Sequence, residues 1–245
     1  MLYYLSMTSI DLSVDLCGIK LSNPTILPSG ILGTTKALLK RVAENGAGAV
    51  TIKSVSVEAR EGHKNPTVIP LYPPLLKGEK GGLIGMMNAV GYSNPGMEEA
   101  VKEFTDLHEV GVPVIASVVG TEAKDFARVA EKLSKNGFAA IEIPLSCPHT
   151  PGFGLLAGHG TPEATFKIIS VVRKVTALPI FAKLSPNVLE IGRIAKAAED
   201  AGANAITAVN TMGPGMIINI EAKRPVLDFK VGGISGAALR PVAVR

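Results

Sequence analysis

The residues best suited to chemistry lie where an apolar run in the middle of the chain gives way to a loop. The run covers residues 139–145, and Ser146-Cys-Pro-His149 follows it, with further Pro and Gly residues beyond. A cysteine thiol titrates close enough to neutral pH to exchange protons, and a nearby cation or hydrogen-bond donor can tune it. Free cysteine is also often buried for packing alone. Cys147 is therefore a candidate general base, with a packing role as the alternative.

Length and composition are those of one globular domain covering residues 1–245. Hydrophobic residues make up 47% of the chain and charged residues 19%, which excludes a disordered protein. Aromatic residues make up only 4%, without tryptophan, so we expect no base-stacking platform and no nucleic acid partner. The formal net charge of +4 comes from scattered basic residues, which suits small anionic ligands.

The cysteine content indicates a reducing compartment, because Cys17 and Cys147 are too few for a disulfide framework. The four histidines show no paired spacing with acids of the kind that binds zinc, so no metal site is expected. The chain start, at Met1 or Met7, has no signal-peptide pattern. No uncharged apolar run approaches membrane-spanning length. We therefore expect a soluble, cytoplasmic protein with no membrane partner.

Short apolar runs alternate with amphipathic helical patterns over most of the chain, which predicts a parallel sheet covered by helices. The expected strands lie at residues 25–30, 49–52, 114–118, 139–145, 179–184 and 205–209. The expected helices cover residues 34–44, 95–110, 121–135, 161–176, 189–202 and 237–244, with Thr121 and Thr161 as N-terminal caps and Leu189 facing inward. Residues 55–95 show no regular period, and a segment of this length is usually a lid or binding loop.

Polar residues follow the carboxyl ends of these strands, which favours a (β/α)8 TIM barrel over an open sheet. They are Ser29, Lys53, Ser117, Cys147, Lys183 and Asn210. In a barrel the carboxyl ends of the strands converge on one pocket. No Gly-x-Gly-x-x-Gly pattern follows a strand, so a Rossmann fold lacks its fingerprint. Only six of the eight strand–helix units are recognised, and we therefore expect the chain to be incomplete at its C-terminus.

Seven motifs in order resemble those of the class 1 dihydroorotate dehydrogenases, and more narrowly the archaeal and bacterial class 1B catalytic subunits. They are Pro28-Ser-Gly30, Thr51-Ile-Lys-Ser54, Asn88-Ala-Val-Gly91 with Asn94-Pro-Gly96, Leu145-Ser-Cys-Pro148, Phe181-Ala-Lys-Leu-Ser-Pro-Asn187, Val209-Asn-Thr211, and Lys230-Val-Gly-Gly-Ile-Ser-Gly236 with Arg240-Pro241. The resemblance implies an FMN-dependent barrel that oxidises dihydroorotate to orotate in pyrimidine biosynthesis.

The resemblance also implies roles for individual residues. Cys147 would be the base that removes the proton from carbon 5, while hydride passes from carbon 6 to FMN. Substrate-contacting positions would be Lys53, Asn88, Ala89, Val90, Gly91, Tyr92, Asn210 and Thr211. Flavin-contacting positions would be Ser29, Lys53, Ser54, Lys183, Val209 and Gly236. The phosphate-binding loops of the family belong to the last two barrel strands, which are not recognised in this chain.

Family members of this class pass electrons to NAD through a second subunit that carries FAD and a 2Fe–2S cluster, so the resemblance implies a homodimer or a heterotetramer. Departures from the family pattern leave two alternatives open. Pro144 and Ser117 replace asparagines, His149 replaces another asparagine, and Tyr92 stands where leucine is usual. The alternatives are a related flavoenzyme acting on another dihydropyrimidine, since those enzymes share His149, and a non-catalytic truncated remnant.

Overall fold

The computed structural model describes residues 10–72, 82–146, 152 and 158–245. Its main element is a six-stranded parallel sheet with the order β10-β9-β8-β7-β4-β3. The strands are β3 (Ile26–Leu27), β4 (Ala49–Thr51), β7 (Val114–Ser117), β8 (Ala140–Pro144), β9 (Ile180–Lys183) and β10 (Ala205–Thr207). All six strands expected from the sequence are confirmed, and they pair in parallel.

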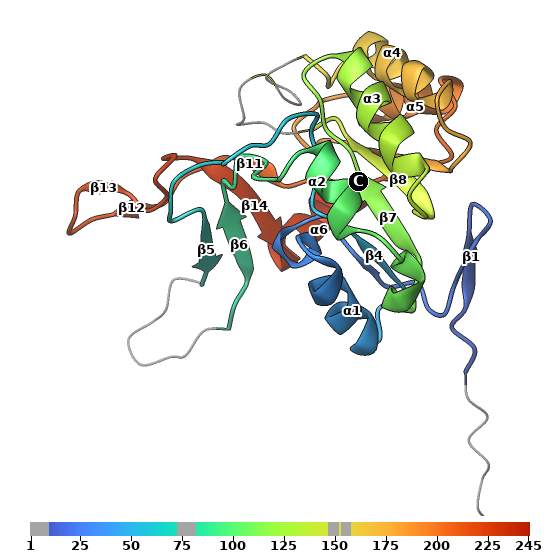
Figure 1. Cartoon of the computed structure of the whole chain (residues 1–245). Helices are drawn as coiled ribbons and strands as arrows, with labels where there is room; N and C mark the ends of the chain where they lie inside the picture. The colour runs from blue at the N-terminus through green and yellow to red at the C-terminus, as the bar shows by residue number, and fades with distance from the viewer. Residues whose placement is uncertain (1–9, 73–81, 147–151, 153–157) are drawn as a thin grey trace, which may run out of the picture.

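Helices connect successive strands, and α3, α4 and α5 pack side by side beside the sheet (Figure 1). The helices are η1 (Ile31–Gly33), α1 (Lys36–Glu44), α2 (Met97–Glu103), η2 (Leu107–Val110), α3 (Ala123–Ser134), α4 (Pro162–Arg173), α5 (Ile191–Asp200), η4 (Ala237–Leu239) and α6 (Arg240–Val244). Thr161 caps α4 as expected, because its hydroxyl accepts the N–H of Ala164. This alternation of parallel strands and helices is a partial (β/α)8 barrel, which confirms the expected fold class.

The core lies between this sheet and its helices. Every residue of β7, β8 and β9 is buried, as expected for parallel strands covered on both faces. Leu39 of α1, Phe126 of α3 and Ile169 of α4 are among the largest fully buried side chains. Full burial of one such side chain contributes about 1.5–3 kcal/mol. The core therefore holds the carboxyl ends of the central strands in fixed positions.

A four-stranded antiparallel sheet, ordered β11-β14-β6-β5, projects to one side of the partial barrel (Figure 1). Its strands are β5 (Val68–Leu71), β6 (Gly85–Asn88), β11 (Met212–Gly215) and β14 (Gly232–Gly236), and two short hairpins join β1 (Val14–Leu16) to β2 (Ile19–Leu21) and β12 (Ile218–Asn219) to β13 (Arg224–Pro225). The expectation that residues 55–95 lack regular structure is therefore wrong. Both β5 and β6 are short, and β6 pairs with β14 from the far end of the chain, a contact without a local sequence signal.

The helix expected over residues 95–110 is two shorter helices, and this correction has a visible cause. The side-chain amide of Asn136 donates hydrogen bonds to the carbonyl oxygens of Val101 and Phe104, at 3.1 and 2.8 Å. These carbonyls lie at the end of α2, so a residue from a distant turn satisfies groups that a longer helix would have paired internally.

Two other details of the expected helices are wrong. The N-terminal cap of α3 is Glu122, and the hydroxyl of Thr121 instead donates to the Asp125 carboxylate at 2.7 Å. Leu189 is 93% exposed, because α5 begins only at Ile191 and leaves Leu189 in the preceding loop.

Met1, Met7, Cys147 and His149 lie outside the described residues, so their predicted roles stay predictions. Within the described part of the chain, no helix combines the length and apolar character needed to cross a membrane.

Candidate active site

An open cavity of about 240 Å³ lies at the carboxyl ends of the parallel strands, beside the antiparallel sheet. Both sheets and their connecting loops contribute to its wall. The lining residues are Ser29, Gly30, Ile31, Lys53, Ser54, Val68, Met86, Asn88, Val90, Gly91, Tyr92, Pro144, Lys183, Asn210, Thr211 and Ser235. The expected convergence of strand-end residues is thereby confirmed for Ser29, Lys53, Lys183 and Asn210. The location is the one where barrels of this kind bind ligands.

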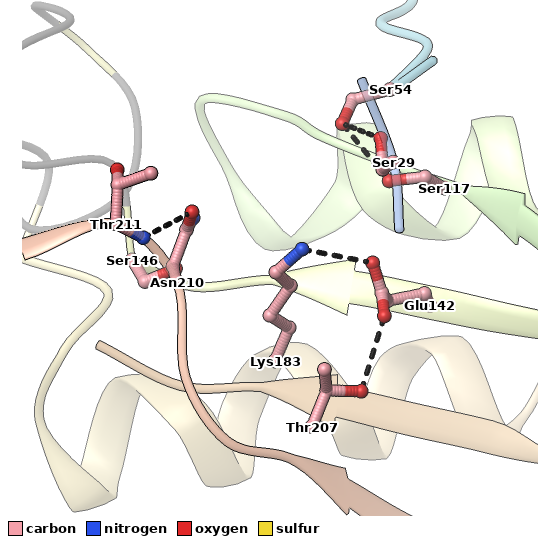
Figure 2. Close-up of polar contacts among 9 residues, drawn as sticks. All are labelled: Ser29, Ser54, Ser117, Glu142, Ser146, Lys183, Thr207, Asn210 and Thr211. Atoms are coloured by element: carbon pink, nitrogen blue, oxygen red, sulfur yellow. Dashed lines mark hydrogen bonds and ion pairs between the residues drawn. The ribbon is translucent and has the colours of Figure 1, made fainter. Parts of the chain in front are cut away.

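Two lysines bring positive charge to this cavity. The Lys53 ammonium, just after β4, lies 5.4 Å from the centre of the Tyr92 ring, within cation–π range. Lys183 ends β9, and its Nζ lies 3.5 Å from Oε1 of Glu142 on β8 (Figure 2). The cavity therefore offers one half-buried cation beside an aromatic ring, and one that is almost fully buried.

Three hydroxyls form a chain across neighbouring strands (Figure 2). Ser54 Oγ lies 3.1 Å from Ser29 Oγ and 2.9 Å from Ser117 Oγ. Ser29 and Ser54 line the cavity, while Ser117 is fully buried behind them. Ser117 therefore supports the lining hydroxyl of Ser54 and does not itself line the cavity.

Asn210 lines another part of the cavity wall and makes two hydrogen bonds there. Its side-chain amide donates to Ser146 Oγ at 2.7 Å, and its Oδ1 accepts the backbone N–H of Thr211 at 2.8 Å. Ser146 is fully buried and directly precedes Cys147. The start of the segment that carries Cys147 is thus tied to the carboxyl end of β10.

The segment 88–91 contributes Asn88, Val90 and Gly91 to the cavity wall. Gly91 has φ of 76°, and a Cβ there would lie 2.8 Å from the His63 ring. That ring stacks on Phe229, with centroids 3.9 Å apart, and its Nδ1 lies 3.0 Å from the carbonyl oxygen of Ala89. Ala89 itself is buried in the small core beneath the antiparallel sheet. Ala89 does not line the cavity, in contrast to Asn88 and Val90.

Comparison with known proteins agrees with this geometry. The family model for dihydroorotate dehydrogenase matches residues 11–245. The catalytic subunit of dihydroorotate dehydrogenase B (NAD(+)) from Methanocaldococcus jannaschii is 40% identical over 238 residues, which cover 96% of this chain and 73% of that protein. Proteins of the same description from Methanothermobacter thermautotrophicus and Pyrococcus abyssi are 43% and 42% identical, with the same coverage. The chain belongs to the dihydroorotate dehydrogenase family.

As a family member the chain is an oxidoreductase, and dihydroorotate dehydrogenases use a flavin. The cavity suits a flat heterocycle with polar edges. Ile31, Val68 and Met86 supply apolar surface, while Lys53 and Lys183 bring positive charge to the cavity.

Val209 and Gly236 do not line the cavity, although the family pattern places both beside the flavin. Gly236 has φ of 120°, and a Cβ there would lie 2.4 Å from the Gly85 Cα. The pairing of β14 with β6 therefore requires a glycine at position 236.

Sequence reasoning missed several lining residues and one buried acid. The lining residues it missed are Gly30, Ile31, Val68, Met86 and Ser235, most of them from loops and the antiparallel sheet. Glu142 was missed as well. Its signal was available, because an acidic residue inside the apolar run 139–145 has to be paired.

Proposed function

We propose that this chain is the catalytic subunit of a class 1B dihydroorotate dehydrogenase, which oxidises dihydroorotate to orotate with FMN in the synthesis of UMP. The observation that carries the proposal is a cavity at the carboxyl ends of the barrel strands that combines Lys53 and Lys183 with the amides of Asn88 and Asn210. Family membership supports the same assignment.

The substrate is a ring with amide edges and a carboxylate, and the residues of the cavity complement both. The side-chain amides of Asn88 and Asn210 each offer a donor and an acceptor to the ring, and Thr211 adds a hydroxyl. Lys53 offers a cation for the carboxylate. Ser29, Ser54 and Lys183 would hold the flavin on the other side of the same cavity.

The reaction requires a proton and a hydride to leave adjacent carbons. A flavin held by Ser29, Ser54 and Lys183 would supply the acceptor for the hydride of carbon 6. The chain supplies the base, and we assign that role to Cys147, which takes the proton from carbon 5. Ser146 immediately before it is held by Asn210, so the base is delivered from a fixed strand end. Such positioning of base and substrate lowers the entropic part of the barrier.

Electrons must leave the reduced cofactor, and the names of the relatives identify NAD(+) as their acceptor. A 2Fe–2S cluster held on four thiolates cannot form from the two cysteines of this chain. We infer that a second subunit carries FAD and the cluster, in a heterotetramer built on a homodimer of this chain. The cytoplasm, where thiols stay reduced, suits such an assembly.

A visible absorption spectrum taken before and after anaerobic addition of dihydroorotate tests the proposal. We expect a flavin spectrum that bleaches on addition of the substrate. Flavin that binds but is not reduced by dihydroorotate would refute the substrate. Failure to bind FMN would favour the non-catalytic alternative for the 245-residue chain.

A second candidate, a related flavoenzyme acting on another dihydropyrimidine, is favoured by Pro144. This residue lines the cavity beside Lys183, with which it pairs in the sheet, and its ring offers no hydrogen bond to a carboxylated pyrimidine. Dihydrouracil is the matched probe, because it lacks only the carboxylate. Faster bleaching by dihydrouracil than by dihydroorotate would establish this alternative.

A further inference from the structure

Glu142 is a buried acid at the base of the cavity that the proposed reaction does not use. Its side chain is 7% exposed, and that of Lys183 is 10% exposed. Glu142 Oε1 lies 3.5 Å from Lys183 Nζ, and Oε2 accepts the hydroxyl hydrogen of Thr207 at 3.1 Å (Figure 2). Oε1 is buried without a hydrogen bond from any described group, so the ammonium is the partner that compensates its charge.

Three adjacent strands hold this arrangement in register. Lys183 of β9 is paired with Pro144 on one side and with Thr207 on the other. Side chains two residues apart on a strand share a face, so Glu142 lies one layer below Pro144, which lines the cavity. The carboxylate therefore lies in the layer below the cavity, and it contacts the ammonium of Lys183, which lines the cavity.

Buried charges need a counter-charge, and this requirement indicates a role for the pair of Glu142 and Lys183. A charge as buried as that of Lys183 or Glu142 is costly unless an opposite charge accompanies it, because neither group can be solvated by bulk water. The Glu142 carboxylate balances the charge of the Lys183 ammonium when no anion is bound in the cavity. Because Thr207 binds the second oxygen, the carboxylate keeps one orientation toward the lysine.

We propose that Glu142 is a positioning residue for Lys183, holding its side chain as an ammonium group at the base of the cavity, with Thr207 fixing the carboxylate in turn. The consequence for a flavin rests on the proposed function. A charged Lys183 stabilises negative charge that develops above it, whereas a neutral amine does not.

The charge state of Lys183 can be measured without any cofactor, because only a neutral amine reacts in reductive methylation. Labelling at Lys183 is followed by peptide mass spectrometry at fixed pH, with the exposed lysines of the chain as an internal reference. Glu142→Gln keeps the shape of the side chain and removes its charge, and we expect Lys183 to react on the order of tenfold faster. Glu142→Asp keeps the charge and should stay closer to the wild-type rate.

Thr207→Val provides a second variant should Glu142→Gln fail to fold, and we expect a smaller increase in the same direction. The matched control is Thr165→Val at a buried threonine whose hydroxyl donates to the carbonyl oxygen of His159 instead. This control should leave Lys183 labelling unchanged. An unchanged rate in folded Glu142→Gln would overturn the proposal, and so would equal rates in Thr207→Val and the control.

The midpoint potential of bound FMN separates this proposal from the proposed function. We expect a lower potential in Glu142→Gln, because the reduced, anionic flavin loses its cation. Faster labelling together with an unchanged potential would support the role of Glu142 while contradicting the placement of the flavin beside Lys183.

Discussion

Asn94 joins the segment that carries Tyr92 to the segment that follows β4. Its Oδ1 accepts the backbone N–H groups of Ser56 and Gly96 at 3.1 and 2.9 Å. Its amide donates to Ser56 Oγ at 2.8 Å and to the carbonyl oxygen of Tyr92 at 2.7 Å. Asn94 is itself buried, so these four hydrogen bonds are shielded from water. Lys53 and Tyr92, which line the cavity, depend on the two segments that it joins.

The contacts allow the cost of Asn94→Ala to be estimated. The N–H groups of Ser56 and Gly96 would each lose a buried acceptor, at about 1–3 kcal/mol apiece. The carbonyl of Tyr92 would lose a donor at about 1 kcal/mol, whereas Ser56 Oγ keeps its hydrogen bond to the carbonyl oxygen of Glu58. We therefore expect the free energy of unfolding to fall by about 3–7 kcal/mol.

Urea denaturation at fixed temperature measures this change, read from the transition midpoint at a constant slope. Asn45→Ala is the matched control, because the exposed Asn45 amide donates a single hydrogen bond to the carbonyl oxygen of Arg41 at 2.7 Å. It should cost about 0.5–1 kcal/mol. A loss for Asn94→Ala no larger than that of the control would refute the hydrogen-bond reasoning.

Other expectations concern the base, a buried histidine and a crowded glycine. Cys147→Ser should keep bound flavin yet slow its reduction by dihydroorotate by about 10²–10⁴-fold, because a hydroxyl is a far weaker base; an unchanged single-turnover rate would remove Cys147 from this role. Burial lowers the pKa of His159 below its usual 6.5, opposed by a hydrogen bond to the Thr121 carbonyl oxygen. The unfolded chain therefore binds the proton first, so stability should fall as the pH drops below about 6.5. His159→Gln should flatten that part of the stability profile while the exposed control His108→Gln should not, and equal profiles would contradict the assignment. In Gly33→Ala, the added Cβ would lie 2.6 Å from the backbone N of Lys53 and O of Thr51, whereas Gly192→Ala meets nothing within 4 Å. We expect thermal unfolding to show a loss of about 1–3 kcal/mol for the first and no loss for the second, and equal melting temperatures would contradict the predicted clash.

The sequence was sufficient for the barrel pattern because the strand signals are local. The apolar runs 49–52, 179–184 and 205–209 each carry a polar residue suited to chemistry at or just after the end. The structure brings these residues, Lys53, Lys183 and Asn210, to one cavity. The motifs also indicated the family, which the comparisons confirm. Composition, hydrophobic period and sequence motifs are properties of short stretches of chain, so they can be recognised from the sequence alone.

Tertiary structure decided what depends on contacts between distant residues. The wall formed by β5, β6 and β14 was not predicted, because Asn88 meets Gly233 across 145 positions of sequence. The end of α2 was missed for the same reason, since Asn136 from another turn satisfies its last carbonyls. The pairing of Glu142 with Lys183 needed the register of two strands. Sequence by itself determined the kind of barrel and the chemistry at its strand ends, because those signals are local. Only the folded chain decided which side chains share the cavity and which buried charges balance each other, because register and packing set those distances.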